Sequence, residues 1–403
     1  MRTIGVVTGA RSDYGIYRPL LRKLHAHPAA DLAVYATGMH LAPEFGLTVR
    51  QIEADGFPVA ERVESLLAAD TPAGLAGSMG LGVLGFAQAF GRRRPDLLVV
   101  LGDRPEMHAA ALAALPFKLP VAHIHGGELT EGAIDDALRH SLTKLSHLHF
   151  VAADAYARRV VQLGEEPWRV TVCGAPGLDD LILTPRLSDE RLSARIGLPL
   201  DPPPLLVTFH PVTLEYEKTE WQVAELLAAL AAADLPVVFT RPNADTRGRA
   251  VAWMINAFAR DYPRARLAGD LGTDAYFSLM AAAAAMVGNS SSGLIEAPSF
   301  KLPVVNVGTR QRGRFRAANV IDVGHGRGEV IDGIRRATHP DFRGRVLRDL
   351  VNPFDRGGAA DLILRHLITV PLDDRLLTKR FHDLPTDAAP TSPGRAAAPE
   401  ENT

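Results

Sequence analysis

The chain of 403 residues has a single cysteine, and its charges almost cancel, with 44 Lys and Arg against 46 Asp and Glu. One cysteine excludes a disulfide framework and any site built from several thiolates, such as an iron–sulfur centre. A net charge of −2 provides no broad basic field of the kind that attracts nucleic acid or anionic membranes. We therefore expect no nucleic-acid partner, and Cys173 is most simply a small buried apolar residue.

Long apolar runs and a leader sequence are also lacking. No stretch approaches the roughly 18 uninterrupted apolar residues that a membrane-spanning helix needs. The first three residues lead directly into an apolar strand pattern, without the charged region, apolar stretch and cleavage site of a signal peptide. We expect a cytoplasmic protein without membrane contact that handles a small molecule.

Short apolar runs, most of them closed by glycine, alternate with helical patterns through the first half of the chain. The predicted strands are residues 3–8, 32–37, 97–101, 121–125, 147–151 and 170–173. The predicted helices between them are residues 17–25, 107–115, 137–145 and 156–163. Continuous apolar strands that alternate with helices are typical of βαβ units in a buried parallel sheet.

The pattern restarts after a segment that ends in three prolines. Second-half strands are predicted at 205–209, 236–239, 285–287 and 304–307, with helices at 220–231, 250–260, 275–284 and near 358–367. We predict an α/β protein of two Rossmann-like domains that face each other across a cleft. Their ranges are 1–180 and 205–370, with a connection at 181–204 and an extension at 371–403 that is disordered after about residue 387.

Polar residues gather at the predicted carboxyl ends of these strands, where ligands bind in open α/β sheets. The candidate residues at these ends are Arg11, His40, Asp103, Arg104, His125, Glu128, His210, Asn243, Asn289 and Arg310. His210 is suited to donate to a phosphate or to carry a proton, and the alternative is an exposed loop histidine. Asp103 either caps the next helix or belongs to the site, and Arg104 beside it would keep it ionised.

The motif GNSSSG at residues 288–293 follows a strand and precedes a helix. Hydroxyls and free amides at a helix N-terminus favour phosphate, so Ser290 and Ser291 are candidate phosphate ligands. The alternative is a serine that only caps the helix. Glu296 is placed to accept hydrogen bonds from two ribose hydroxyls, and Arg310 to pair with the same phosphates. The trailing Lys-Ser/Thr of a Walker A loop is absent.

Histidines and carboxylates cluster between residues 123 and 140. His123 and His125 would share one face of a strand, and Glu128 would complete a metal-binding trio. Tight packing in a parallel sheet favours a hydrogen-bonded core histidine instead, and we expect neither metal nor cofactor. Asp135 and Asp136 precede Arg139 and His140 by four residues each, so they are either surface ion pairs or part of the cleft.

Taken together, the motifs resemble the hydrolysing UDP-N-acetylglucosamine 2-epimerases of sialic acid and related pathways. The shared segments, in order, are GARSDYG, TGMH, LGDRPE, HIHGGE, IDDALRHSLTKLSHLHF, FHPVT, PNAD, GNSSSGLIEAPSF and GTRQRGR. The resemblance covers nearly all of the predicted folded chain. It implies a fold like that of GT-B glycosyltransferases and a reaction without metal or redox cofactor. The implied products are free N-acetylmannosamine and UDP, formed by anti elimination to a 2-acetamidoglycal and addition of water.

The resemblance also implies roles for single residues. Asp103 and Asp135 match the catalytic carboxylates, and His210 matches the catalytic histidine. The nucleotide-binding positions are matched by Arg11, Ser290, Ser291, Glu296 and Arg310. The family usually forms dimers or tetramers, so we expect a homodimer or homotetramer.

One position departs from the family pattern. Members that serve sialic acid synthesis have HIEGGE, whereas this chain has His125 in place of the first glutamate and keeps Glu128. Either His125 or Glu128 takes the acid–base role. The change would also suit a different sugar, such as a 2,4-diacetamido-trideoxyhexose on the legionaminic acid route.

Three rival functions use the same fold. A GT-B glycosyltransferase needs fewer carboxylates than Asp103, Glu128, Asp135 and Asp136 provide. Non-hydrolysing 2-epimerases resemble the chain less at GARSDYG and IDDALRHS, and a non-catalytic sensor of nucleotide sugars would not need the carboxylates.

Overall fold

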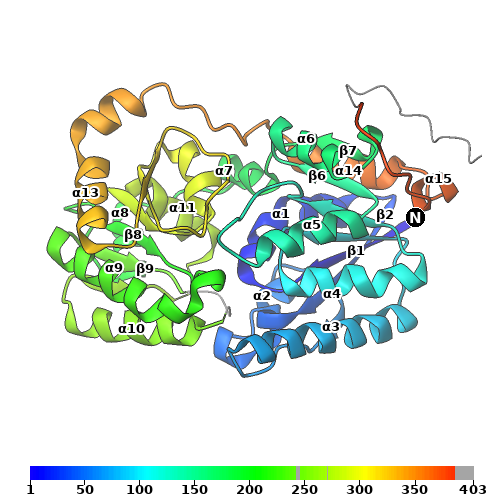
Figure 1. Ribbon diagram of the computed structural model, residues 1–403, viewed down its shortest axis with the longest axis horizontal. Helices are drawn as coiled ribbons and strands as arrows, with labels where there is room; N and C mark the ends of the chain where they lie inside the picture. Colours follow the sequence, from blue (N-terminus) through cyan, green and yellow to red (C-terminus); the bar gives the residue numbers. More distant parts are fainter. Residues whose placement is uncertain (242–245, 270, 386–403) are drawn as a thin grey trace, which may run out of the picture.

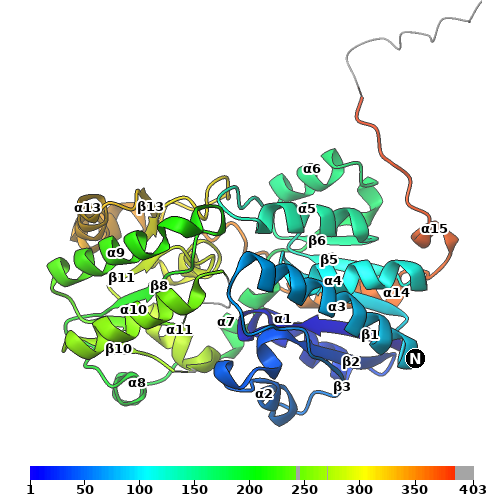
Figure 2. The same ribbon diagram turned by 60° about the horizontal axis from the view of Figure 1, so that its bottom comes forward.

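The computed structural model describes residues 1–241, 246–269 and 271–385, which form two α/β domains side by side (Figures 1 and 2). The expected nucleotide-binding residue Asn243 and the tail after about residue 387 lie outside the described residues. The predicted α/β fold with two Rossmann-like domains is confirmed.

The first domain contains a parallel sheet of seven strands in the order β3-β2-β1-β4-β5-β6-β7. Its strands are β1 (Arg2–Thr8), β2 (Ala30–Thr37), β3 (Val59–Val63), β4 (Leu97–Leu101), β5 (Val121–Ile124), β6 (Leu148–Val151) and β7 (Val170–Val172). Its helices are α1 (Arg11–Ala26), α2 (Val49–Ala54), α3 (Pro72–Arg92), α4 (Pro105–Ala114), α5 (Asp135–Leu145) and α6 (Asp154–Gln162). All five residues of β4 are buried, as the uninterrupted apolar run LLVVL predicts for a central parallel strand.

The second domain repeats the arrangement with six strands in the order β10-β9-β8-β11-β12-β13. Its strands are β8 (Leu205–Thr208), β9 (Val237–Phe239), β10 (Ala265–Leu267), β11 (Ala285–Gly288), β12 (Val304–Val307) and β13 (Val320–Val323). Its helices include α8 (Asp189–Ile196), α9 (Thr219–Ala233), α10 (Gly248–Asp261), α11 (Gly272–Ala282), α12 (Ser292–Ile295) and α13 (Arg327–Thr338), and α7 (Asp179–Leu183) begins the connection. Each sheet has a core of its own.

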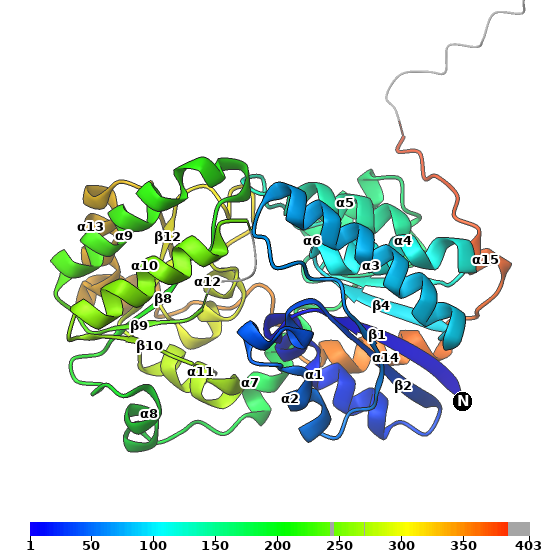
Figure 3. The same ribbon diagram turned by 90° about the horizontal axis from the view of Figure 1, so that it is seen from below.

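The last long helix belongs to the first domain, whereas the sequence predicted it in the second. Helix α14 (Ala359–Thr369) and the short α15 (Asp374–Leu377) pack into the core of the first domain, where Ile363 and Leu367 are fully buried (Figure 3). The Asp179 carboxylate accepts hydrogen bonds from the backbone of Ala359 and Ala360, which caps α14. The range 205–370 for the second domain is therefore wrong, because the apolar face of α14 completes the first core.

Helix α3 was not predicted, since its sequence contains many glycines. It is also the one helix, among the described residues, that is long and apolar enough to cross a membrane by length and composition alone. Phe86, Ala89 and Phe90 of α3 lie in the first core, and 33% of its most apolar 18-residue stretch is buried. Gly82 and Gly85 permit this packing, because a Cβ at Gly85 would lie 2.6 Å from Val63 Cγ1.

Candidate active site

Asp103 follows β4 and points toward helix α5. Its carboxylate pairs with the guanidinium of Arg139, whose side chain is almost fully buried. Arg139 also donates to the Glu128 carbonyl at 3.2 Å and to Thr130 Oγ1 at 2.7 Å. Asp103 does not cap α4, because the helix begins after Arg104 and has no side-chain cap. The carboxylate is therefore held at the strand end by a cation from the neighbouring helix.

Arg104 has a different partner from the one predicted. Its guanidinium lies 2.9 Å from Glu106 Oε1 and 3.7 Å from Asp13 Oδ2. The arginine that contacts Asp103 is instead the buried Arg139. The prediction that Arg104 keeps Asp103 ionised is therefore wrong as to the residue. The charged group that the structure pairs with Asp103 is Arg139, which lies four residues after Asp135 but does not form the predicted helix-surface pair.

His123 and His125 do not share a face as predicted. Strand β5 ends at Ile124, and His125 has a left-handed backbone conformation with φ 64°, so the alternation of side chains breaks there. His123 is fully buried with Nε2 at 2.7 Å from the Gly102 carbonyl, which makes it a core histidine. His125 Nδ1 instead lies 2.6 Å from Glu128 Oε1. His125 and Glu128 thus form a dyad within one loop.

Glu128 connects this dyad to the second domain. Its Oε2 lies 2.5 Å from Nη2 of Arg314, which follows β12, and both side chains are buried. Burial alone would favour the neutral acid, but the charges of Arg314 and His125 outweigh it, so the pKa of Glu128 is well below its usual value. Glu128 is therefore a carboxylate at neutral pH and not a proton donor.

Asp135 and Asp136 begin helix α5 and face different partners. Asp135 Oδ2 lies 3.4 Å from Nη2 of Arg310 in the second domain. Asp136 accepts a hydrogen bond of 2.6 Å from the backbone of Thr130 and lies 3.6 Å from His140 Nε2. The surface-pair alternative therefore holds for Asp136 with His140, whereas Asp135 lies in the contact between the domains.

His210 follows β8 and is bracketed by Asn289. The Asn289 side chain accepts from the His210 amide at 2.7 Å and donates to the His210 carbonyl at 2.8 Å. Burial, with the charges of Arg310 and Arg104, holds the pKa of His210 well below its usual value. The imidazole is thus neutral at pH 7 and nearly buried, which argues against the exposed-loop alternative. Asn289 is fully buried and positions His210 rather than presenting its amide to a ligand.

The GNSSSG motif forms a loop after β11. At Gly288, with φ 132°, a Cβ would lie 1.9 Å from the Thr208 carbonyl oxygen, so only glycine fits. Helix α12 has four residues and therefore only a weak dipole. Ser291 makes no side-chain cap, but the Ser290 hydroxyl accepts from the Ser292 amide at 3.3 Å, so the capping alternative holds in part for Ser290. The hydroxyls and amides of Ser290 and Ser291, rather than a long helix, are what this loop offers to an anion.

Glu296 ends α12. Burial raises its pKa to about 7 despite a hydrogen bond with Ser292. Its Oε2 is buried and, within residues 1–241, 246–269 and 271–385, has no hydrogen-bond partner. A buried carboxyl oxygen of this kind suits a hydroxyl donor from a ligand.

Arg11 and His40 were both predicted to bind the ligand, and their surroundings differ. Arg11 begins α1, and the Asp13 carboxylate shapes the loop before it by accepting from the backbone of Gly9 and Ala10 at 3.0 Å each. His40 is fully buried, with one ring nitrogen 2.9 Å from Thr8 Oγ1 and the other 2.7 Å from Thr48 Oγ1. Since both nitrogens of His40 have protein partners, we correct its assignment to a structural one.

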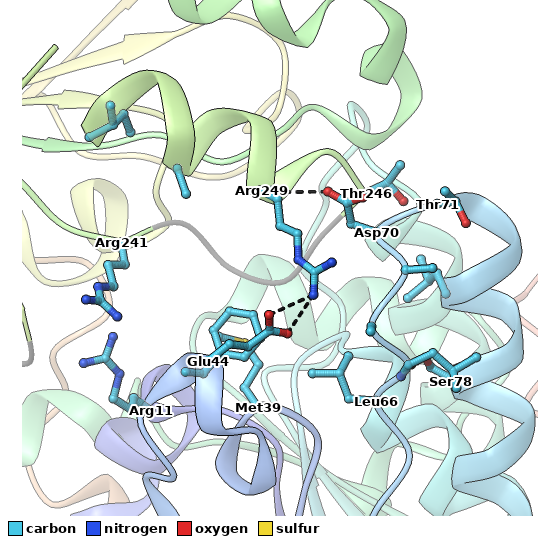
Figure 4. Close-up of a pocket in the computed structure, with 18 of the residues that line it drawn as sticks. Arg11, Met39, Glu44, Leu66, Asp70, Thr71, Ser78, Arg241, Thr246 and Arg249 are labelled. Carbon is cyan, nitrogen blue, oxygen red and sulfur yellow. Dashed lines mark hydrogen bonds and ion pairs between the residues drawn. The ribbon is translucent and has the colours of Figure 1, made fainter. Parts of the chain in front are cut away.

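A cavity of about 320 Å³ lies between the domains beside Arg11 (Figure 4). Arg11 and Arg241 stand at one side of it with their guanidinium groups turned toward each other. On the other side, Arg249 of α10 contacts Glu44 at 2.8 Å, and its backbone amide donates to Asp70 at 3.3 Å. Ion pairs between the two domains therefore bridge the cleft at three places. Arg249 pairs with Glu44 at its edge, and Asp135 and Glu128 pair with arginines of the second domain.

The arrangement brings carboxylates of the first domain against cations of the second. Arg314 interacts electrostatically with Glu128, Asp103 and Asp135. Paired carboxylates and a histidine can move protons, while Arg310 and the loop after β11 can receive an anionic leaving group. Within the part of the chain that the structure describes, no three His, Cys, Asp or Glu side chains are grouped to hold a metal ion.

Two residues of this site were missed by sequence reasoning. Arg139 and Arg314 both lie in quoted motifs, IDDALRHS and GTRQRGR, but neither follows a strand directly. The available signal in the sequence was a basic residue within a motif that the family shares. Only the fold shows which carboxylate each of these arginines contacts.

Comparison with known proteins identifies relatives along nearly the whole chain. A family model described as UDP-N-acetylglucosamine 2-epimerase matches residues 22–368. A Legionella pneumophila protein named UDP-N,N'-diacetylbacillosamine 2-epimerase (hydrolyzing) is 37% identical over 380 residues, which cover 94% of this chain and 99% of the relative. A Campylobacter jejuni protein named GDP/UDP-N,N'-diacetylbacillosamine 2-epimerase (hydrolyzing) is 39% identical over 323 residues, which cover 80% of this chain and 84% of the relative.

Solved structures show the same fold. The crystal structure of a Neisseria meningitidis UDP-GlcNAc 2-epimerase bound to UDP-GlcNAc has a TM-score of 0.76 at 18% identity, covering 92% of this chain and 100% of that chain. A Staphylococcus aureus structure, MnaA with UDP, has a TM-score of 0.75 at 18% identity, covering 91% of this chain and 96% of that chain. At such identities the likeness establishes the architecture.

Proposed function

Because the chain belongs to the UDP-N-acetylglucosamine 2-epimerase family, we propose that it is a hydrolysing member that converts a UDP-2-acetamido sugar to the free 2-epimer and UDP. In the first step a base removes the C2 proton while the bond from C1 to the diphosphate oxygen breaks, which gives a glycal. C2 then takes a proton on the opposite face, and C1 takes a water molecule, which loses a proton. One water is consumed for each UDP released.

Asp103, Asp135 and His125 are the groups we assign to the proton transfers. A C2 proton is a very weak acid, so its removal has to be coupled to departure of the leaving group, with acid–base groups on both faces of the ring. The 2.6 Å contact of His125 with the Glu128 carboxylate supports an acid–base role for the imidazole. Glu128, which is fixed as an anion, then orients His125. The His125–Glu128 dyad is the single observation that carries this assignment.

The leaving nucleotide is assigned mainly to the second domain, with Arg11 added from the first domain. We propose that Arg11, Arg310, Ser290 and Ser291 hold the diphosphate and that Glu296 accepts the ribose hydroxyls. The neutral His210 would donate a hydrogen bond to the diphosphate. Support comes from Glu296 Oε2, which has no hydrogen-bond partner among the residues that the structure describes, and from the glycine-dependent loop after β11.

For the sugar, we propose a 2,4-diacetamido-trideoxyhexose in preference to N-acetylglucosamine. Two relatives of 37% and 39% identity carry names for diacetylbacillosamine substrates. A Neisseria meningitidis relative named UDP-N-acetylglucosamine 2-epimerase is 31% identical over 342 residues, which keeps N-acetylglucosamine as the second candidate.

NMR in D₂O tests the proposal directly. The protein is incubated in parallel with UDP-N,N'-diacetylbacillosamine and with UDP-N-acetylglucosamine, and proton and phosphorus spectra are followed. We expect free UDP and a free sugar deuterated at C2 from the diacetamido substrate, at a higher kcat/KM than from the other. A 2-epimer still attached to UDP would indicate the non-hydrolysing reaction, and transfer to an added acceptor would indicate a glycosyltransferase. Light scattering of the same sample tests the expected homodimer or homotetramer.

A further inference from the structure

The loop after β12 connects the two halves of the site through a continuous series of hydrogen bonds. Gln311 is fully buried, and its side-chain nitrogen donates to the Asn289 carbonyl at 2.7 Å. Its side-chain oxygen accepts from Arg314 Nη1 at 3.1 Å. Since Asn289 brackets His210, and Arg314 contacts Glu128, one series of bonds runs from His210 in the second domain to His125 in the first.

Arg314 is the member of this series that crosses between the domains. Its side chain is 9% exposed, and it reaches Glu128, whose side chain is 2% exposed. Neighbouring backbone contacts hold the crossing in place, because the Glu131 amide donates to the Arg312 carbonyl at 3.2 Å. Gly132 is close enough to Thr309 that a Cβ there would lie 2.4 Å from its carbonyl oxygen. The pairing thus depends on contact between the two domains.

Resting on the proposed function, we propose that Arg314 is a positioning residue that completes the His125–Glu128 dyad only when the domains are in contact. Glu128 has two oxygens, and one is taken by His125 while the other is taken by Arg314. With both oxygens engaged, the carboxylate cannot rotate, and the imidazole ring is held in one orientation. Without Arg314, one oxygen of the buried Glu128 carboxylate would lose its ion pair, and the side chain could turn away from His125.

Several charged and titratable groups surround Glu128 and enter any pH effect. Besides His125 and Arg314, Arg139 of α5 donates to the Glu128 carbonyl and adds positive charge. Burial, and after it the charge of Glu128, raises the pKa of Tyr156 of α6. Asp103 and Asp135 act on Arg314 from the opposite side. Removing Arg314 leaves Arg139 as the nearby guanidinium and raises the pKa of Glu128, so this carboxylate would take up a proton at a higher pH.

The test compares Arg314→Gln with Arg312→Gln, a matched change of an exposed arginine in the same loop. For Arg314→Gln we expect kcat to fall at least tenfold, while the affinity for UDP measured by calorimetry stays within about threefold. The acidic limb of the kcat/KM profile should move up by about one pH unit or more. Arg312→Gln should match the unmodified protein in all three measurements. Added guanidinium should restore part of the activity of Arg314→Ala, which a folding defect would not allow.

Hydrogen exchange provides a readout that does not depend on turnover. With UDP bound, residues 125–139 should exchange faster in Arg314→Gln than in the unmodified protein or in Arg312→Gln. Failure of every UDP-sugar to react with the unmodified protein would overturn the proposed function, whereas the exchange result would still decide the role of Arg314. Equal exchange rates, or an unchanged pH profile with full kcat, would overturn the positioning role.

Discussion

Arg310 and Asp135 meet across the two domains, with Nη2 of the arginine 3.4 Å from Oδ2 of the aspartate. Arg310 also donates to the Asn289 carbonyl at 3.3 Å, beside the loop that we assign to the diphosphate. A bound diphosphate would compete with Asp135 for this guanidinium. If the diphosphate draws Arg310 toward itself, Asp135 would lose a stabilising cation and become a stronger base, so our proposal links nucleotide binding and proton removal at one ion pair.

The carboxylates should matter for turnover and not for nucleotide affinity. We expect Asp103→Asn and Asp135→Asn each to lower kcat by about a hundredfold or more, in the range of a lost acid–base group. The affinity for UDP should stay within a few-fold, because neither carboxylate is assigned to the nucleotide, and it should rise slightly in Asp135→Asn, where Arg310 loses its competing carboxylate. Steady-state kinetics and calorimetry measure the two effects. Near-full kcat in Asp103→Asn would show that the assignment of Asp103 is wrong.

The residues assigned to the diphosphate should behave in the opposite way. Ser290→Ala and Arg310→Gln are expected to raise KM more than they lower kcat, because they remove binding that substrate and transition state share. The affinity for UDP should fall by tenfold or more in Arg310→Gln, because this variant loses a charge-assisted contact. Arg312→Gln serves again as the control of equal charge change. An unaltered KM in Arg310→Gln would place the phosphates elsewhere.

His125 can be tested for chemistry and for substrate choice separately. His125→Glu places a carboxylate at this position, and we expect improved relative use of UDP-N-acetylglucosamine if this position selects the sugar. His125→Asn tests the chemistry, because asparagine tolerates the left-handed backbone found here but cannot transfer a proton at neutral pH. We expect His125→Asn to fold normally by circular dichroism and to lose most of its turnover. Activity of the asparagine variant on any UDP-sugar near that of the unmodified protein would exclude the acid–base role.

Glu165 should stabilise the fold in a pH-dependent manner. Burial alone would raise its pKa, but hydrogen bonds from His149, Lys144 and Lys379 outweigh it and lower the pKa to about 2. A depressed carboxyl pKa stabilises the folded state above the unfolded value near 4.5, and this stabilisation is lost as the pH falls toward 2. Glu165→Gln should therefore lower the free energy of unfolding by about 3 kcal/mol at pH 7.

The difference between Glu165→Gln and the unmodified protein should shrink below pH 4.5, and urea unfolding at pH 7, 5.5 and 4 measures it. Glu166→Gln is the neighbouring control, because Glu166 is partly exposed and pairs with one arginine at 2.9 Å. A constant difference across the three pH values would indicate that the ion cluster does not titrate as assigned.

Metal removal tests the expected reaction without a cofactor. If Arg310 and the loop after β11 receive the departing diphosphate, then treatment with EDTA should leave kcat unchanged. Loss of turnover that a divalent cation restores would show that an ion shares this task.

The strands and their ends were predictable, whereas contacts between distant segments were not. Buried strands such as β4 carry uninterrupted apolar runs, so the sequence locates them and the polar residues after them. The edge strand β3, with sequence VAERV, has charges on it and was missed. Helix α3 was missed because glycine disfavours helix, and its glycines are explained only by the close approach of neighbouring elements.

The roles of the arginines illustrate the same limit within the site. Arg104 is next to Asp103 in sequence but turns to Glu106, while Arg139, which is 36 residues from Asp103, reaches it. Likewise, the expected alternation of side chains along β5 failed at His125, because the positive φ of this residue ends the alternation. The predicted contacts rested on residues that are close in sequence, whereas the observed contacts are set by tertiary packing.

Helix α14 makes the first domain discontinuous along the chain. The polypeptide leaves that domain through the connection after α7 and returns to it at Ala359, where Asp179 caps the helix and Lys23 pairs with Asp361 at 2.7 Å. A fragment that stops near residue 204 would therefore leave the groove for Ile363 and Leu367 open to water. Recombining the first domain of this protein with the second domain of a relative requires two crossover points, one in each of the two chain segments that join the domains.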